Sequence, residues 1–276
     1  MVPPAGAERR TLAAERRTLA AERRTLVASM PKAELHLHLD GSLRVETALE
    51  LARTRDVDAP RDVESMRAAL VAPMPCTSQA ELLRAFDLPI ALMQDADALE
   101  RIAAELVETK AAEHVRYVEI RWGPLLHVVR GLSLEDGIAA VARGARDAAA
   151  RAGIEVRLIC TALRSHDPAA NLELARVAAR FIDDGLTGWD LAGGEERYPD
   201  PALHAAAFAT ARAGGLRITV HAGEWGGAAQ VLRALTQDPE RIAHGPVAID
   251  DPALCRELIA RHVTLDLCPT SNWQAG

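Results

Sequence analysis

Strand-like and helix-like patterns alternate along most of this chain. Short runs rich in β-branched and apolar residues are typical of buried strands, and longer amphipathic runs are typical of helices. The predicted strands are Ala33–Gly41, Val115–Trp122, Glu155–Thr161, Leu186–Leu191, Arg217–His221, Arg241–His244 and Val263–Leu267. The predicted helices are Arg44–Thr54, Ser78–Gln94 with an interruption at Pro89, Ala96–His114, Ser133–Ala152, Pro168–Phe181, Pro201–Ala213, Gly227–Thr236 and Asp251–Arg261. This alternation predicts a parallel sheet whose strands are joined by helical crossovers.

The length of the chain favours a barrel over other parallel-sheet architectures. A (β/α)₈ barrel takes about 250 residues and eight strands, and this chain has 276 residues. The alternative is a doubly wound sheet, but no G-x-G-x-x-G motif follows the first strand, so a dinucleotide site is not supported. We therefore predict an α/β protein with a (β/α)₈ TIM barrel that is incomplete at its C-terminus, lacking the last helix, strand and helix.

The composition argues against some classes of binding partner and indicates the cellular compartment. Aromatic residues make up only 3% of the chain and the net charge is −7, which argues against a nucleic-acid platform. Neither a run of 18 apolar residues nor a secretory signal occurs in the sequence. The cysteines form no C-x-x-C pair, which suits a reducing compartment. We expect a cytoplasmic protein that binds neither nucleic acid nor membranes, and the sequence leaves its oligomeric state open.

A seven-residue repeat, AERRTLA, AERRTLA and AERRTLV, occupies residues 7–27. Each copy offers one leucine (Leu12, Leu19 and Leu26), whereas a coiled coil needs two apolar positions per heptad. We therefore expect residues 1–29 to form a basic tail, flexible or helical, and residues 30–276 to form the barrel domain. The alternative is an arm whose arginines bind an anionic partner.

Two histidines in the first predicted strand indicate a metal site. Residues two apart in a strand share a face, so His36, His38 and Asp40 project together. Paired imidazoles on one rigid element form half of a divalent-metal site. The alternative is a solvated strand face, on which histidine side chains need no partner.

Further polar residues follow the later strands. Catalytic residues of (β/α)₈ barrels come from the C-terminal ends of strands, and His221 and His244 both end predicted strands. With His36 and His38, His221 can supply a third nitrogen ligand for a metal. Glu224, three residues further on, can move the protons that hydrolysis requires, and His244 can lie beside the attacking water.

Five separated motifs then identify a family. They are Met30–Leu43 (MPKAELHLHLDGSL), Asp190–Glu195 (DLAGGE), Val220–Glu224 (VHAGE), Arg241–Gly245 (RIAHG) and Cys268–Asn272 (CPTSN). In these motifs and in their order the chain resembles the adenosine deaminase family of metal-dependent amidohydrolases. The resemblance implies a barrel that binds one Zn²⁺ per chain and hydrolyses the 6-amino group of a purine nucleoside. The expected substrate is adenosine, with 2′-deoxyadenosine as a second candidate, and the products are inosine and ammonia.

The resemblance also implies a role for each candidate residue. The residues that resemble the metal ligands are His36, His38 and His221. Glu224 resembles the proton donor to the purine ring, and His244 resembles the histidine that assists the attacking hydroxide. The residues that resemble the nucleoside site are His38, Asp40 and Gly193, the last through its backbone N–H.

The chain departs from the family pattern in two places. Gly194 stands where the family usually has an acidic residue. The family also continues past the position of Gly276 with a helix and a strand that ends in two aspartates, one for the metal and one for the purine. We therefore expect residues 1–276 alone to show little or no deamination of adenosine and to aggregate or self-associate through unpaired strand edges. The alternatives are a non-catalytic remnant that binds zinc or purine, and a deaminase of adenine or another modified adenosine.

Overall fold

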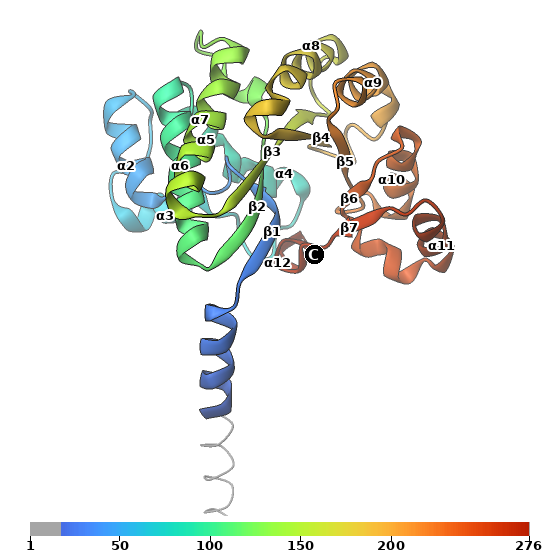
Figure 1. Cartoon of the computed structure of the whole chain (residues 1–276), viewed down its shortest axis with the longest axis horizontal. Helices are drawn as coiled ribbons and strands as arrows, with labels where there is room; N and C mark the ends of the chain where they lie inside the picture. Colours follow the sequence, from blue (N-terminus) through green and yellow to red (C-terminus); the bar gives the residue numbers. More distant parts are fainter. Residues whose placement is uncertain (1–17, 276) are drawn as a thin grey trace, which may run out of the picture.

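The computed structural model describes residues 18–275, which form an α/β barrel (Figure 1). Its seven strands are parallel and are ordered β1 to β7, so each strand pairs with its neighbours in the sequence. The strands are β1 (Lys32–His38), β2 (Val115–Trp122), β3 (Glu155–Leu163), β4 (Leu186–Ala192), β5 (Arg217–Ala222), β6 (Arg241–His244) and β7 (Thr264–Asp266). The expected parallel sheet is confirmed, with seven strands of a (β/α)₈-type barrel in the described residues.

Helices surround the sheet. The α-helices are α2 (Val45–Thr54), α3 (Val63–Leu70), α4 (Gln79–Leu83), α5 (Asp87–Leu92), α6 (Ala96–Ala112), α7 (Leu134–Ala152), α8 (Pro168–Ala178), α9 (Ala205–Ala213), α10 (Gly227–Ala234), α11 (Pro252–Ala260) and α12 (Pro269–Ala275). The 3₁₀ helices are η1 (Arg84–Phe86), η2 (Pro124–His127), η3 (Ala179–Asp184), η4 (Pro201–His204), η5 (Leu235–Gln237) and η6 (Pro246–Asp250). No helix in the described part of the chain combines the length and the apolarity that crossing a bilayer requires.

Local chemistry explains the longest of these helices. The Ser133 side chain caps the start of α7 by accepting a hydrogen bond from the Asp136 N–H, and Gly153 ends the helix at a φ of 67°. A Cβ at Gly144 would lie 2.1 Å from the carbonyl oxygen of Glu100. The missing side chain therefore lets α7 pack directly against α6.

The predicted helix Ser78–Gln94 was wrong in its extent. The structure has three short helices there, α4, η1 and α5, and a further helix, α3, that the sequence analysis did not predict. Pro89 lies in the first turn of α5 and does not interrupt the segment. Backbone N–H groups in a first turn have no acceptor within the helix, so a proline costs little there. Residues of α3, α4 and η1 line one side of the cavity described below.

Residues 18–29 form a helix that projects away from the barrel (Figure 1). Leu19 is 48% exposed and Leu26 is 61% exposed, so these repeat leucines form no buried seam within the described residues. The rest of the predicted tail, residues 1–17, lies outside the described residues. The barrel begins with β1, at Lys32.

The parallel arrangement places several polar side chains at one end of the barrel. His36 and His38 come from the C-terminal half of β1, and Asp190 lies near the end of β4. His221 lies near the end of β5, and His244 is the last residue of β6. The strands all run in the same direction, so these side chains meet although up to 208 residues separate them along the chain, from 36 to 244.

Candidate metal centre and active site

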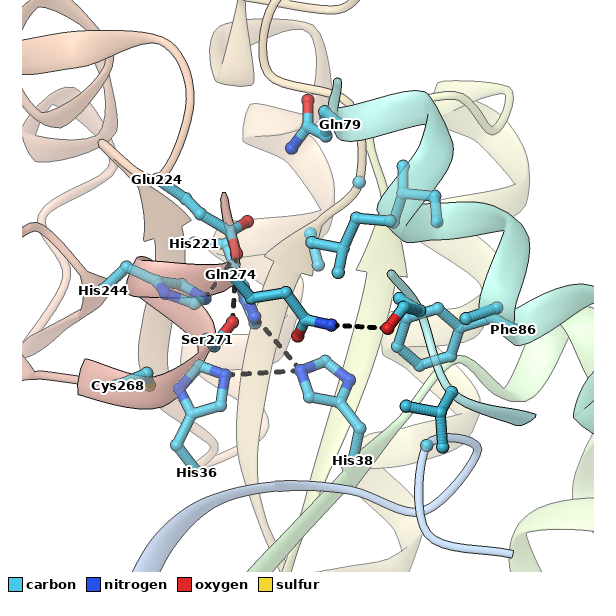
Figure 2. Close-up of a pocket in the computed structure, with 18 of the residues that line it drawn as sticks. His36, His38, Gln79, Phe86, His221, Glu224, His244, Cys268, Ser271 and Gln274 are labelled. Carbon is cyan, nitrogen blue, oxygen red and sulfur yellow. Dashed lines mark hydrogen bonds and ion pairs between the residues drawn. The ribbon is translucent and has the colours of Figure 1, made fainter. Parts of the chain in front are cut away.

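Three imidazole rings from two strands converge in the barrel (Figure 2). His36 and His38 lie on β1, and His221 lies on β5. The Nε2 atom of His38 is 3.3 Å from Nε2 of His36 and 3.3 Å from Nε2 of His221. The structure therefore brings together the three histidines that the sequence offers as metal ligands.

The spacing of these nitrogens fits a tetrahedral zinc site. Zn–N bonds are about 2.0–2.1 Å long, so two ligands of a tetrahedral site lie about 3.3–3.4 Å apart. The two observed separations of 3.3 Å match this value. The donor set and its geometry therefore suit Zn²⁺.

Burial keeps the imidazoles in the form that a metal binds. The pKa of His38 is lowered to about 3, first by burial and then by His221. Burial, followed by the Arg121 guanidinium, holds the pKa of His36 well below its usual value. Metal ligation requires neutral imidazole, so the rings need lose no proton when a metal binds near neutral pH.

A second group of side chains is close enough to hold an ion, but its chemistry is less suitable. The group comprises His36, His244 and Cys268. Burial raises the pKa of the Cys268 thiol to about 11, which disfavours the thiolate that metals bind. The group with three histidines is therefore the better metal site.

Asp190 determines which nitrogen His221 presents. The Nδ1–H of His221 donates to Asp190, with Nδ1 2.9 Å from Oδ2 and 3.0 Å from Oδ1, which leaves Nε2 facing the other histidines. Arg121 Nη1 and Thr161 Oγ1 donate to Oδ2 of Asp190 at 3.2 and 3.3 Å. Burial raises the pKa of Asp190, but His221 and Arg121 lower it by more, so the carboxylate stays ionised.

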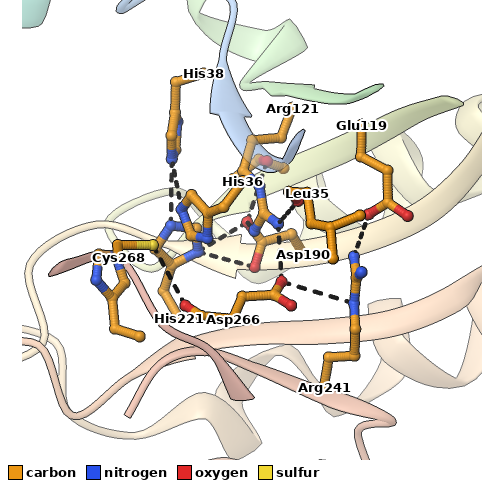
Figure 3. Close-up of polar contacts among 12 residues, drawn as sticks. Leu35, His36, His38, Glu119, Arg121, Asp190, His221, Arg241, Asp266 and Cys268 are labelled. Atoms are coloured by element: carbon orange, nitrogen blue, oxygen red, sulfur yellow. Dashed lines mark hydrogen bonds and ion pairs between the residues drawn. The ribbon is translucent and has the colours of Figure 1, made fainter. Parts of the chain in front are cut away.

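Arg121 belongs to a column of charged side chains inside the barrel (Figure 3). It is fully buried, and its Nη2 lies 3.5 Å from Oδ2 of Asp266. The Nε of Arg241 lies 3.6 Å from the same oxygen, and its Nη2 donates to Glu119. From the sequence, Asp190 was a strand-end residue without a predicted role, and neither Arg121 nor Asp266 was predicted to support the site. The available signal was Glu119 and Arg121, two charged residues that share one face of the predicted strand Val115–Trp122.

Asp40 lies behind His38, outside the cavity. Only 4% of Asp40 is exposed, and its Oδ1 is 3.8 Å from Nδ1 of His38. Its Oδ2 is 3.5 Å from Nε2 of His127, whose Nδ1 lies 3.1 Å from the carbonyl oxygen of Met93. Burial raises the pKa of Asp40, but the neighbouring His127 side chain lowers it by more. His127 is a polar neighbour of the site that the sequence analysis missed.

The histidines open onto a cavity of about 390 Å³ (Figure 2). One wall is apolar and consists of Leu70, Val71, Leu82, Leu83 and Phe86. Gly193 follows β4 with a φ of +98°, and it lines the cavity as the sequence analysis expected of a substrate contact. No lysine or arginine from residues 18–275 lines this cavity.

Glu224 and His244 face each other beside the histidines. Glu224 Oε1 lies 3.6 Å from Nε2 of His244 and accepts a hydrogen bond from Ser271 Oγ at 3.4 Å. Asn272 Nδ2 lies 3.1 Å from Nδ1 of His244, so the amide donates to Nδ1 and the ring proton sits on Nε2. Burial raises the pKa of Glu224 to about 7, His221 opposes this shift and Glu195 adds to it. Glu224 is therefore a carboxylic acid that can release a proton near neutral pH.

The raised pKa of Glu224 predicts that Glu224→Gln stabilises the metal-free protein at high pH. Below pH 4.5, the usual pKa of this group, the carboxyl is protonated in both folded and unfolded chains, and the parent and variant should have similar stability. As the pH rises from 4.5 to about 7, the carboxyl ionises in the unfolded parent but stays protonated in the folded parent. The free energy of unfolding of the parent therefore falls, whereas that of the glutamine variant does not change for this reason. Urea unfolding in EDTA should show an added difference of about 3 kcal/mol at pH 8. A difference that does not change with pH would contradict the shift.

Comparisons with known proteins agree with this geometry. A family model described as adenosine deaminase matches residues 31–276. An adenosine deaminase from Clostridium perfringens is 40% identical over 247 residues, which is 88% of this chain and 74% of that protein. An amidohydrolase structure from Burkholderia ambifaria with bound Zn has a TM-score of 0.82 and 31% identity, covering 91% of this chain and 68% of that one. The structure of an adenine deaminase from Arthrobacter aurescens has a TM-score of 0.78 and 29% identity, covering 88% of this chain and 73% of that one.

These likenesses extend over the barrel that carries the histidines, the acidic residue and the cavity. The matched region begins at residue 31, just before β1, and includes every site residue described above. Identity of 40% over most of the chain accompanies the fold likeness, so sequence and structure point to the same assignment. The chain belongs to the adenosine deaminase family of hydrolases.

Proposed function

We propose that this protein catalyses the zinc-dependent hydrolytic deamination of adenosine, and of 2′-deoxyadenosine, to the inosine nucleoside and ammonia. One observation carries the proposal. Three imidazole nitrogens, two pairs of them 3.3 Å apart as in a zinc site, share a cavity with Glu224, whose pKa is raised to about 7. The imidazoles can hold Zn²⁺, and Glu224 can give up a proton near neutral pH.

The chain's own side chains have distinct roles in this proposal. One Zn²⁺, which lowers the pKa of water, would be held by His36, His38 and His221. Protonated Glu224 donates to a ring nitrogen of the purine as the water oxygen attacks C6. One water proton passes to the 6-amino group, which leaves as ammonia, and the other returns to Glu224. His244 holds the attacking water by a hydrogen bond, and the Gly193 N–H meets a second ring nitrogen.

The lining of the cavity favours an uncharged purine over a nucleotide. Arginine and lysine are the side chains that bind a phosphate group best, and no lysine or arginine among the described residues lines this cavity. The apolar wall formed by the end of α3, α4 and η1 suits a ligand without charge. In the proposal, the nucleoside sugar lies near His38. Asp40 contacts the His38 ring from the side that faces away from the cavity and so supports the sugar site indirectly.

The compartment is a further part of the proposal. All four cysteines are free thiols, and Cys160 is fully buried. Unpaired cysteines are typical of a reducing environment such as the cytoplasm. We therefore propose a cytoplasmic site of action.

Ammonia release from a panel of purines tests the substrate. Adenosine, 2′-deoxyadenosine, adenine and AMP are incubated with zinc-loaded residues 1–276, and with the same residues followed by the C-terminal part of the Clostridium perfringens relative. We expect kcat/KM to be highest for adenosine in the form with detectable activity. A preference for adenine would support the alternative suggested by the Arthrobacter aurescens likeness. Zinc binding without turnover of any purine by either form would support a non-catalytic protein.

Zinc content tests the ligands. His36→Ala, His38→Ala and His221→Ala each remove one nitrogen ligand, so each should retain less than half of the parent's zinc after dialysis against a weak chelator. Loss of one ligand or of its supporting partner costs at least about 10-fold in metal affinity. His262→Asn, at an exposed position, is the matched control and should keep its zinc. Undiminished zinc in all three alanine variants, measured by elemental analysis, would rule out this site.

A further inference from the structure

The loop that carries Glu224 is held by a second buried carboxylate, that of Glu195. Its Oε2 accepts hydrogen bonds from the backbone N–H of Gly223 at 2.9 Å and of Gly226 at 3.3 Å. Its Oε1 accepts from the backbone N–H of Glu224 at 3.1 Å. Only 1% of Glu195 is exposed. One side chain therefore binds three of the four backbone N–H groups in residues 223–226.

These hydrogen bonds explain how the Glu195 carboxylate can be buried without a cationic partner. Within residues 18–275, Glu195 forms no ion pair with a lysine, arginine or histidine. The buried guanidinium of Arg164 donates instead to the carbonyl oxygens of His221 and Tyr198. An ionised carboxylate is costly to bury unless hydrogen bonds replace its water, and three N–H donors do so here.

The glycines of the loop allow this close approach. Gly223 has a φ of +77°, and a Cβ there would lie 2.7 Å from Cγ2 of Val231. A Cβ at Gly226 would lie 2.2 Å from Cγ of Gln230 and 3.1 Å from Oε2 of Glu195. A side chain at Gly226 would therefore crowd the Glu195 carboxylate, and one at Gly223 would clash with Val231.

Glu195 is itself anchored from the other side of the cavity. The side-chain Oε1 of Gln79 accepts a hydrogen bond from the Glu195 N–H at 2.9 Å. Gln79 begins α4 and lines the cavity (Figure 2), whereas Glu195 does not line it. A continuous set of contacts therefore joins α4, the loop after β4 and the loop after β5.

We propose that Glu195 is a positioning residue, which holds the backbone of residues 223–226 so that the Glu224 carboxyl group projects into the cavity. The inference rests on the proposed function, in which Glu224 is the proton donor. Glu195 acts through Glu224 and contacts no substrate. Its replacement should therefore change kcat much more than KM.

Hydrogen exchange tests the hydrogen bonds without relying on activity. Glu195→Gln has one acceptor oxygen and one amide group that can only donate, so at least one loop N–H loses its partner. By mass spectrometry, a peptide spanning residues 223–226 should exchange about 10-fold faster in the zinc-loaded variant. Glu196→Gln, the exposed neighbour, is the matched control and should exchange like the parent. Equal exchange in Glu195→Gln and the parent would overturn the proposal.

A double-mutant cycle tests the action through Glu224. Glu195→Gln should lower kcat for adenosine by about 10²-fold, because small displacements of a reacting group cost this much. In a Glu224→Gln background, the same change should cost less than about 3-fold, since the group being positioned is absent. Full additivity of the two losses would overturn the proposal by showing that Glu195 acts independently of Glu224.

Two further results separate this proposal from the proposed function. If Glu195→Gln fails to fold, Glu195→Asp keeps both acceptor oxygens, and its exchange rate should lie above the parent's. An unchanged rate in Glu195→Asp would overturn the proposal.

If the loop amides lose protection in Glu195→Gln while no form deaminates a purine, the loop contacts stand and the proposed function is wrong.

Discussion

Glu224→Gln is expected to lower kcat for adenosine by about 10²–10⁴-fold, the usual contribution of a general acid or base. Glutamine has nearly the same size and can still accept the hydrogen bond from Ser271, so the cavity should keep its shape. It has no proton to transfer, whereas the parent carboxyl, with a pKa of about 7, does. The variant should therefore bind zinc and purine normally and fail at the chemical step.

Steady-state kinetics and zinc content together check this result in a form of the protein with detectable activity. The matched control is Glu196→Gln, which removes an exposed carboxylate one residue from Glu195 and should keep full activity. Parent-like turnover by Glu224→Gln would rule out the role assigned to Glu224. A variant that had lost its zinc would instead show that Glu224 belongs to the metal site.

Arg121→Met is expected to lower the free energy of unfolding by about 3–5 kcal/mol, the cost of removing one partner from a buried ion pair. The guanidinium is fully buried between the carboxylates of Asp190 and Asp266, at 3.2 and 3.5 Å. Methionine fills similar space without charge, so Asp190 keeps only its bonds to His221 and Thr161. The Asp266 carboxylate keeps only its ion pair with Arg241.

Urea unfolding at pH 7 measures this effect on the zinc-free protein. Arg116→Met, at an exposed position on the same strand, should change stability by less than about 0.5 kcal/mol. The double variant Arg121→Met with Asp266→Asn should recover part of the loss, because it removes one of the two carboxylates that lose the guanidinium. Equal stability of Arg121→Met and the parent would show that the buried guanidinium contributes no net stabilisation.

The order of the elements could be predicted from local pattern. The strand run at residues 115–122 and the helical periodicity at 133–152 appear in the structure within about two residues of their predicted bounds. Side-chain alternation also showed that His36 and His38 share a face of their strand. These properties depend on neighbouring residues, so a single sequence contains them.

Local pattern failed where the chain forms the wall of the cavity. Between residues 63 and 92 the helices are short and packed by their tertiary surroundings, and Pro89 fits a helix that begins only two residues earlier. No periodicity longer than two turns marks such segments, so one long helix was predicted in place of three short ones. Tertiary contacts decided the element boundaries there.

Only the tertiary structure decided which polar residues support the site. His36 and His221 were candidates from the sequence, but their convergence depends on how the sheet curves to bring β1 near β5. The partners Arg121, Asp266 and Glu195 bear ordinary charged side chains whose burial no local pattern reveals. The sequence by itself determined the alternating elements and the residues able to ligate a metal, because both follow from spacing along the chain. The contacts that orient those residues depend on strand register and barrel curvature, which arise when residues distant in the sequence pack together.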